Sequence, residues 1–252
     1  MDDHYSLGLL ERVTRDFIAP HGPFDPREAW ENTYAVYALF LNNPRAARFD
    51  VPMGSLRISR TPLAGGMARL KVEYEKRNRD GGPHRIAGEL ECATDDLATP
   101  ARWQFTAELS PPPQLSVQVL RTRHTMDAVG RRLQLSSQGF KSTLPRPAAF
   151  CSLWTLCDAV QRLPRTQGAA LRFTFFDLNF APKKDHLLRY RESTEQTYPK
   201  TPESPVRLHA FEQLGEGLVS SIYWTGDNGR LLFFASALHA YVLHSAQAKE
   251  AA

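Results

Sequence analysis

The chain has 252 residues, of which 31 are Lys or Arg and 27 are Asp or Glu, giving a formal charge of +4. The basic residues are scattered along strand-like segments, whereas nucleic-acid-binding proteins concentrate positive charge on one face. We therefore expect no nucleic-acid partner. No apolar run of about 18 residues is present, which excludes a membrane-spanning helix. The mild basic excess leaves peripheral contact with an anionic membrane open.

The first residues are acidic and show no apolar signal segment, so the sequence as written is expected to be cytoplasmic. The protein would be periplasmic or secreted if a cleaved signal peptide preceded this sequence. Cys92, Cys151 and Cys157 lack zinc-type spacing, and His239 and His244 are predicted to face opposite sides of a strand. We therefore expect no metal and no cofactor, and leave the oligomeric state open.

Two helices are predicted in an N-terminal helical segment, residues 1–50. Apolar residues recur at the helical period within residues 6–18 and again within residues 25–43. A strand interpretation of "TYAVYALFL" competes with the second helix, because β-branched and aromatic residues are frequent in it.

From residue 54 to residue 245, apolar and polar side chains alternate, which predicts strands. The segments "RDGG" and "GDNG" mark two hairpin turns, and residues 101–109 alternate without error. Because the connections are short, the strands are expected to pair antiparallel. About nine to eleven strands are expected by this periodicity, within a single domain that spans residues 1–252.

One apolar helix is predicted between the strands, at residues 147–163, with Pro147 and Pro164 at its ends. A helix that is apolar on nearly all sides is buried on nearly all sides. The expected fold is therefore mainly β (α+β), with a large curved antiparallel sheet or half-barrel wrapped around this helix. Two interpretations stay open: the helix fills the interior as core, or it leaves an apolar cavity between itself and the sheet.

The alternating strands at 101–135 and 171–198, the helix between them and the hairpin "YWTGDNGRLLFF" together resemble the periplasmic half-barrel carriers of lipids and lipoproteins. In that family a long antiparallel sheet wraps around helices and holds acyl chains. The resemblance lies in the pattern of elements and includes no diagnostic motif. The sequence departs from the family in lacking a signal peptide and a lipobox cysteine. The resemblance implies an apolar ligand and no catalytic residue.

The leading hypothesis is binding or carriage of an apolar small molecule or lipid in a cavity between the curved sheet and the helix. Small-molecule sites often lie in the mouths of barrels and are lined mainly by apolar side chains. The large aromatic residues expected to contact such a ligand are Trp103, Phe105, Phe150, Trp154, Phe173, Phe175, Tyr223 and Trp224.

The alternative hypothesis is an enzyme, an isomerase, cyclase or hydrolase, that acts on an apolar substrate in the same cavity. A carboxyl group in an apolar cavity has a raised pKa and can serve as an acid or a base. The candidates are Asp158, on the polar edge of the helix, and Asp177, after "FTFF". Tyr190, His186 or Tyr223 would be their neighbours. A structural protein with a filled core is the third possibility.

Overall fold

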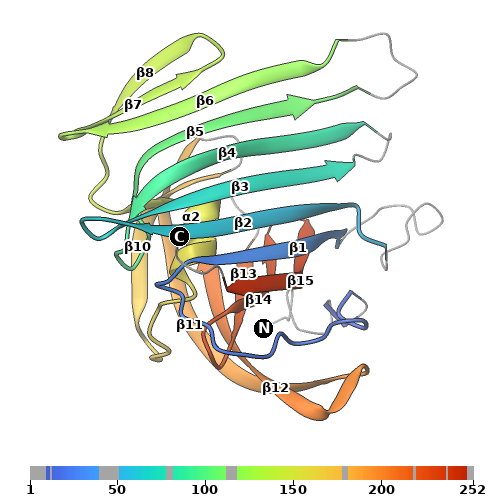
Figure 1. Cartoon of the computed structure of the whole chain (residues 1–252). Coiled ribbons are helices and arrows are strands. Elements are labelled where there is room, and N and C mark those ends of the chain that lie inside the picture. The colour runs from blue at the N-terminus through green and yellow to red at the C-terminus, as the bar shows by residue number, and fades with distance from the viewer. Residues whose placement is uncertain are drawn as a thin grey trace.

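The computed structural model describes residues 10–11, 13–39, 51–77, 82–111, 118–177, 181–217, 220–236 and 238–248. Within them, fifteen strands form one continuous curved sheet around one α-helix (Figure 1). The elements are β1 (Trp30–Ala38), β2 (Gly54–Leu63), β3 (Met67–Arg77), β4 (Pro83–Ala93), β5 (Pro100–Leu109), β6 (Leu120–Val129), β7 (Arg132–Ser137), β8 (Phe140–Pro145), β9 (Phe150–Ser152), α2 (Leu153–Ala159), β10 (Ala170–Phe176), β11 (Pro182–Tyr198), β12 (Thr201–Leu214), β13 (Ser221–Gly226), β14 (Leu231–Ser236) and β15 (His239–Ala248).

The sheet consists of two meanders joined at its middle. Its strand order is β8-β7-β6-β5-β4-β3-β2-β1-β15-β14-β13-β12-β11-β10-β9. The junction is the antiparallel pairing of β1 with β15, in which Tyr34 lies opposite Leu243. All neighbouring strands pair antiparallel except β9 and β10, which run parallel. The antiparallel, mainly β fold is confirmed, whereas the expected count of nine to eleven strands is too low.

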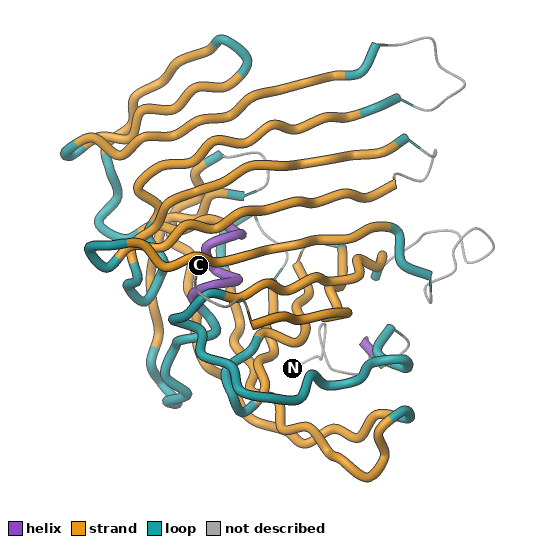
Figure 2. The backbone as a smooth tube through the Cα atoms, viewed as in Figure 1, coloured by secondary structure: helices purple, strands orange, loops and turns teal. Residues whose placement is uncertain are grey.

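The sheet curls until its short end strand β9 lies against β5. At this seam the rings of Trp103 on β5 and Phe176 on β10 are 5.3 Å apart, edge to face. Strands β6, β7 and β8 extend beyond the seam, as the upper part of the trace shows (Figure 2). The result is a barrel-like body with a three-stranded extension.

The prediction of a helix over residues 25–43 is wrong, because residues 30–38 form the strand β1. The side chains of Trp30, Asn32, Tyr34 and Val36 are buried, and those between them are half-buried, which is the period of two of a strand. Residues 40–43 lie outside the described part of the chain. The competing strand interpretation of "TYAVYALFL" is therefore confirmed where the structure describes it.

The N-terminal segment covers the outer face of the sheet. Of the helix predicted at 6–18, residues 6–9 and 12 lie outside the described residues, and residues 13–16 form turns and bends. The Phe17 ring contacts Phe233 at 4.5 Å and Tyr198 at 4.9 Å, both edge to face. Because this segment covers one face of β14 and the interior covers the other, every residue of β14 is buried.

The inserted helix is shorter than expected. Residues 150–152 form the strand β9, and the helix α2 runs only from Leu153 to Ala159. Ser152 caps it: the Ser152 side chain accepts from the Thr155 N–H at 3.2 Å, and the Thr155 hydroxyl accepts from the Ser152 N–H at 2.8 Å. Such a reciprocal cap satisfies two backbone donors that a helix start leaves unpaired. All seven helical residues are buried, as expected for a helix inside the sheet.

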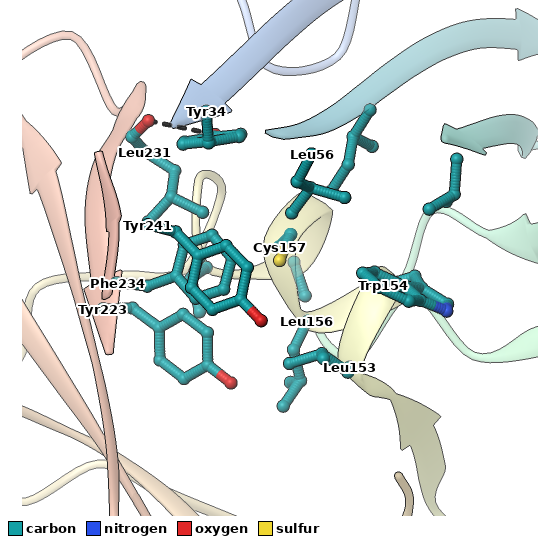
Figure 3. Close-up of a cluster of buried hydrophobic side chains, with 14 of the residues drawn as sticks. Tyr34, Leu56, Leu153, Trp154, Leu156, Cys157, Tyr223, Leu231, Phe234 and Tyr241 are labelled. Carbon is teal, nitrogen blue, oxygen red and sulfur yellow. Dashed lines mark hydrogen bonds between the residues drawn. The ribbon is translucent and has the colours of Figure 1, made fainter. Parts of the chain in front are cut away.

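Aromatic residues from opposite parts of the sheet surround α2 (Figure 3). On one side Phe234 stacks on Tyr241 at 4.0 Å and on Tyr223 at 5.8 Å, and the labelled Cys157 and Leu156 of the helix face these rings. On the other side Trp154 lies 6.2 Å from Tyr74 on β3 and 6.4 Å from Phe105 on β5. Helix and aromatic rings therefore form one continuous core.

A buried ion network fixes the helix to the surrounding strands. Asp158 Oδ1 lies 3.1 Å from Arg60 Nε on β2, and both side chains are 1% exposed. Asp158 Oδ2 accepts from Arg162 at 2.7 Å, and Arg162 also donates to the carbonyls of Thr94 and Asp95 in the β4–β5 turn. Arg60 in turn donates to the carbonyl of Glu28 at 3.0 Å. Burial raises the pKa of Asp158 above its usual value, and the two arginines oppose that shift.

We expect Asp158→Ala to lower the free energy of unfolding by about 3–5 kcal/mol, because it leaves Arg60 buried without a counter-charge. Urea unfolding followed by tryptophan fluorescence measures the change. The matched control is Glu195→Ala, which removes the partner of an exposed pair with Arg207 and should cost a small fraction of that amount. Equal losses in the two variants would contradict the role given to the buried network.

Candidate functional site

The aromatic residues predicted to contact a ligand are almost completely buried. Their exposed fractions do not exceed 4%: Trp103, Phe105, Phe150, Trp154, Phe173, Phe175, Tyr223 and Trp224. Trp224 pairs with Phe233 in the ladder and therefore lies on the outer face with it, away from the helix. Side chains packed to this degree act as core, so any ligand surface must be formed by more exposed neighbours.

The exposed continuation of this core is the inner face of β5, β6, β7 and β8, which we call the inner wall. The ladder register sets its rows: Trp103 lies opposite Met126, Phe105 opposite His124, and Leu109 opposite Leu120. Residues two apart on a strand share a face, so these side chains point to the same side as the core. The wall consists of Trp103, Phe105, Ala107, Leu109, Leu120, Thr122, His124, Met126, Ala128, Leu133, Leu135, Ser137, Phe140, Ser142 and Leu144.

Side-chain exposure on the inner wall rises along the strands, from the buried Met126 and Leu133 toward the pair Leu109 and Leu120. Met126 and Leu133 are fully buried, whereas Leu109 is 42%, Leu120 54% and Phe140 80% exposed. The buried part includes Trp103, which packs against Phe176 of β10 at the seam, and the exposed part comprises the ladder pair Leu109 and Leu120, on β5 and β6, together with Phe140 on β8. A contiguous apolar surface exposed to water typically marks a site for a partner or an apolar ligand.

Each of the two candidate carboxylates forms ion pairs with basic side chains. Asp158 belongs to the buried network with Arg60 and Arg162. Asp177 follows β10 and lies 3.1 Å from Lys183 Nζ. The two carboxylates occupy different places in the fold, so the structure does not bring them together as an acid–base pair.

A second candidate, His186, belongs to a buried chain of hydrogen bonds. The Tyr223 hydroxyl donates to Gln213 Oε1 at 2.9 Å, and Gln213 Nε2 lies 3.2 Å from His186 Nδ1. Burial lowers the pKa of His186, so the ring is neutral at pH 7 and accepts at Nδ1 from the amide. The aromatic rings of Phe173 and Phe175 pack against the imidazole at 6.0 and 5.2 Å. The structure thus joins His186 to Tyr223 through a glutamine.

Tyr190 has a different partner. Its hydroxyl lies 3.3 Å from His209 Nδ1, and His209 Nε2 lies 2.9 Å from Asp227 and 3.0 Å from Arg165. Arg165 and Asp227 also line a cleft of about 390 Å³ beside the end of α2, together with Arg27 and the β13–β14 turn. Most of the residues that line this cleft are polar, whereas most residues of the inner wall are apolar.

Several of these residues were not singled out from the sequence. His209 and Gln213 lie in β12, whose pattern predicts a strand but gives no sign of its cross-strand partners. Leu109 carried a usable signal, since it continues the alternation of its strand to the end, whereas Leu120 is followed by the polar Thr122 and His124 on its face of β6. Phe140 stands next to the Gln138–Gly139 turn and has no such pattern around it.

Neither metal nor membrane features are found in the described residues. No group of three or more His, Cys, Asp or Glu side chains is arranged to hold a metal ion. Among the same residues, no helix is long and apolar enough to cross a bilayer. The three cysteines are buried and unpaired.

Comparison with known proteins identifies the fold. No family model and no curated protein matches the sequence. A solved structure does match: a β-barrel-like protein of a domain of unknown function, DUF1849, from Brucella abortus. The match has a TM-score of 0.59 at 7% identity, and covers 89% of this chain and 99% of the other. The expected barrel-like β fold is therefore confirmed, and at this identity the likeness concerns the fold alone.

We expect Gly215→Ala to destabilise the protein by about 1–3 kcal/mol, because overpacking a filled core costs that much. A Cβ at this position would lie 2.4 Å from His186 Nδ1. In a His186→Ala background the same substitution should cost much less, since the ring that it meets is gone. Urea unfolding of the four proteins measures the coupling, and equal costs in both backgrounds would refute the contact.

Proposed function

We propose that this protein binds an apolar small molecule or lipid, and that an acyl chain of this ligand lies along the inner wall of β5–β8. The observation that carries the proposal is the exposure of Leu109, Leu120 and Phe140 on one face of a continuous sheet. Among the described residues, five of the eight large apolar side chains that are exposed lie between residues 109 and 140. Three of these five, Leu109, Leu120 and Phe140, belong to the inner wall, whereas Val119 and Val129 do not.

The arrangement supports an elongated ligand. Along β5 the inner wall is apolar from the buried Trp103 through Phe105 and Ala107 to the exposed Leu109, whereas on β6 His124 and Thr122 separate the buried Met126 from the exposed Leu120. Burial of apolar area contributes about 25 cal/mol per Å², so a chain along several such side chains gains several kcal/mol. The interior next to α2 is packed, and we therefore place the contact on the exposed part of the inner wall rather than against the helix.

The resemblance to half-barrel carriers of lipids and lipoproteins points to the same class of ligand. This resemblance rests on the sequence pattern of alternating strands around one inserted helix. Binding of the ligand is the first part of this proposal, and carriage of the ligand between membranes is the second. Acid–base catalysis ranks second, because the best-placed group, His209, adjoins a polar cleft and an Asp227 side chain that is 66% exposed.

Binding of N-phenyl-1-naphthylamine, a neutral probe that fluoresces in apolar surroundings, tests the proposal. We expect saturable fluorescence enhancement with the wild-type protein. Leu120→Glu should weaken probe binding at least about tenfold, because the apolar probe would have to desolvate a carboxylate. The leucine is 54% exposed, so the substitution should leave the fold intact.

The matched control is Ile18→Glu, at a side chain that is 55% exposed next to the segment covering the outer face of β14. It introduces the same charge at an equally exposed site and should leave probe binding unchanged. Circular dichroism and urea unfolding verify that both variants fold. No saturable enhancement with the wild type, or equal binding by both variants, would overturn the proposal.

A further inference from the structure

A small basic cluster lies at the exposed end of the apolar interior. Lys76 Nζ on β3 lies 3.2 Å from His239 Nε2 on β15, and His84 on β4 is the ladder partner of Lys76. All three side chains are half-buried. They point inward: Lys76 shares a face with Tyr74, His239 with Tyr241, and the His84 ring lies 5.9 Å from Tyr74, edge to face.

The cluster carries positive charge without an acidic partner. Burial, Lys76 and His84 together lower the pKa of His239 to about 4, so this ring is neutral at pH 7 and accepts a hydrogen bond from Lys76. Burial also lowers the pKa of Lys76, but no carboxylate within the described residues pairs with it. An ammonium group has three donors, and His239 accepts only one of them.

The basic cluster and the inner wall are adjacent on the sheet. In one row across the strands, Lys76 pairs with His84, His84 with Leu109, and Leu109 with Leu120. Neighbouring strands lie about 4.8 Å apart, so the Lys76 backbone is about 10 Å from that of Leu109. A half-buried cation therefore borders the exposed end of an apolar surface.

We propose that the ligand of the inner wall is an anionic single-chain amphiphile, whose head group binds Lys76 while its chain lies along Leu109 and Leu120. This inference rests on the proposed function and adds the chemistry of the head group. Hydrogen bonds between an ammonium and an anion are about twice as strong as those between neutral groups. A carboxylate at this position would satisfy the two remaining Lys76 donors and neutralise the charge.

Two ligands with the same chain test the inference: dodecanoate, which is anionic, and dodecan-1-ol, which is neutral. Each is titrated against bound N-phenyl-1-naphthylamine at pH 7.5, below the critical micelle concentration. We expect the wild type to bind dodecanoate about tenfold more tightly than dodecanol. Lys76→Gln should remove this preference by weakening dodecanoate alone, and Lys76→Arg should restore most of it.

Lys71→Gln is the matched control, because Lys71 lies on the same strand but on the outer face, in an ion pair with Glu73. It should keep the preference for dodecanoate. Equal affinities of the wild type for the two ligands, or a preference that survives Lys76→Gln, would overturn the assignment of the head group while leaving an apolar site. Failure of probe, acid and alcohol alike to bind would overturn the proposed function itself.

Discussion

The attachment of α2 to the sheet through Asp158 is the interaction on which the interior depends. A seven-residue helix is too short to be stable by itself. The helix is stabilised instead by its capping box, by its aromatic contacts and by the ion pairs of Asp158 with Arg60 and Arg162. These contacts reach β2 and the β4–β5 turn, while the stacked rings of β13–β15 cover the opposite side. The helix thereby joins strands from both meanders of the sheet.

The curl of the sheet explains why one apolar face is left exposed. The helix fills the space as far as the seam between β5 and β9, and three more strands follow in the ladder after β5. Their inner side chains include buried apolar residues, Met126 and Leu133, and exposed ones, Leu120 and Phe140, and the polar members of the same face are Thr122, His124, Ser137 and Ser142. The exposed apolar side chains of this face are where we propose that an apolar ligand binds.

Much of the fold follows from local sequence signals, and the errors have identifiable causes. The pairings of β3 with β4 and of β13 with β14, predicted from glycine-rich turns, and the alternating strand β5 are confirmed, while residues 79–81 of the "RDGG" turn lie outside the described part of the chain. Strand β1 was ambiguous because Trp30 and Tyr34 are four residues apart, a spacing that places two side chains on the same face of either a helix or a strand. The strands β8 and β9 were missed because the first is exposed throughout most of its length and the second has three residues. The candidate site was harder to predict, since Lys76, His84 and His239 come together only through the register of the ladders.

The pairing of β1 with β15 has a consequence for how the chain reaches its folded state. Each of the two meanders contains mostly neighbouring strands, which can pair as soon as they emerge from the ribosome. The central ladder instead joins residues such as Tyr34 and Leu243, which are about two hundred positions apart, so a large loop must close before it forms. Until β15 has been synthesised, β1 presents an unpaired edge with alternating apolar side chains. This edge is the point where the nascent protein most needs protection against association with other chains.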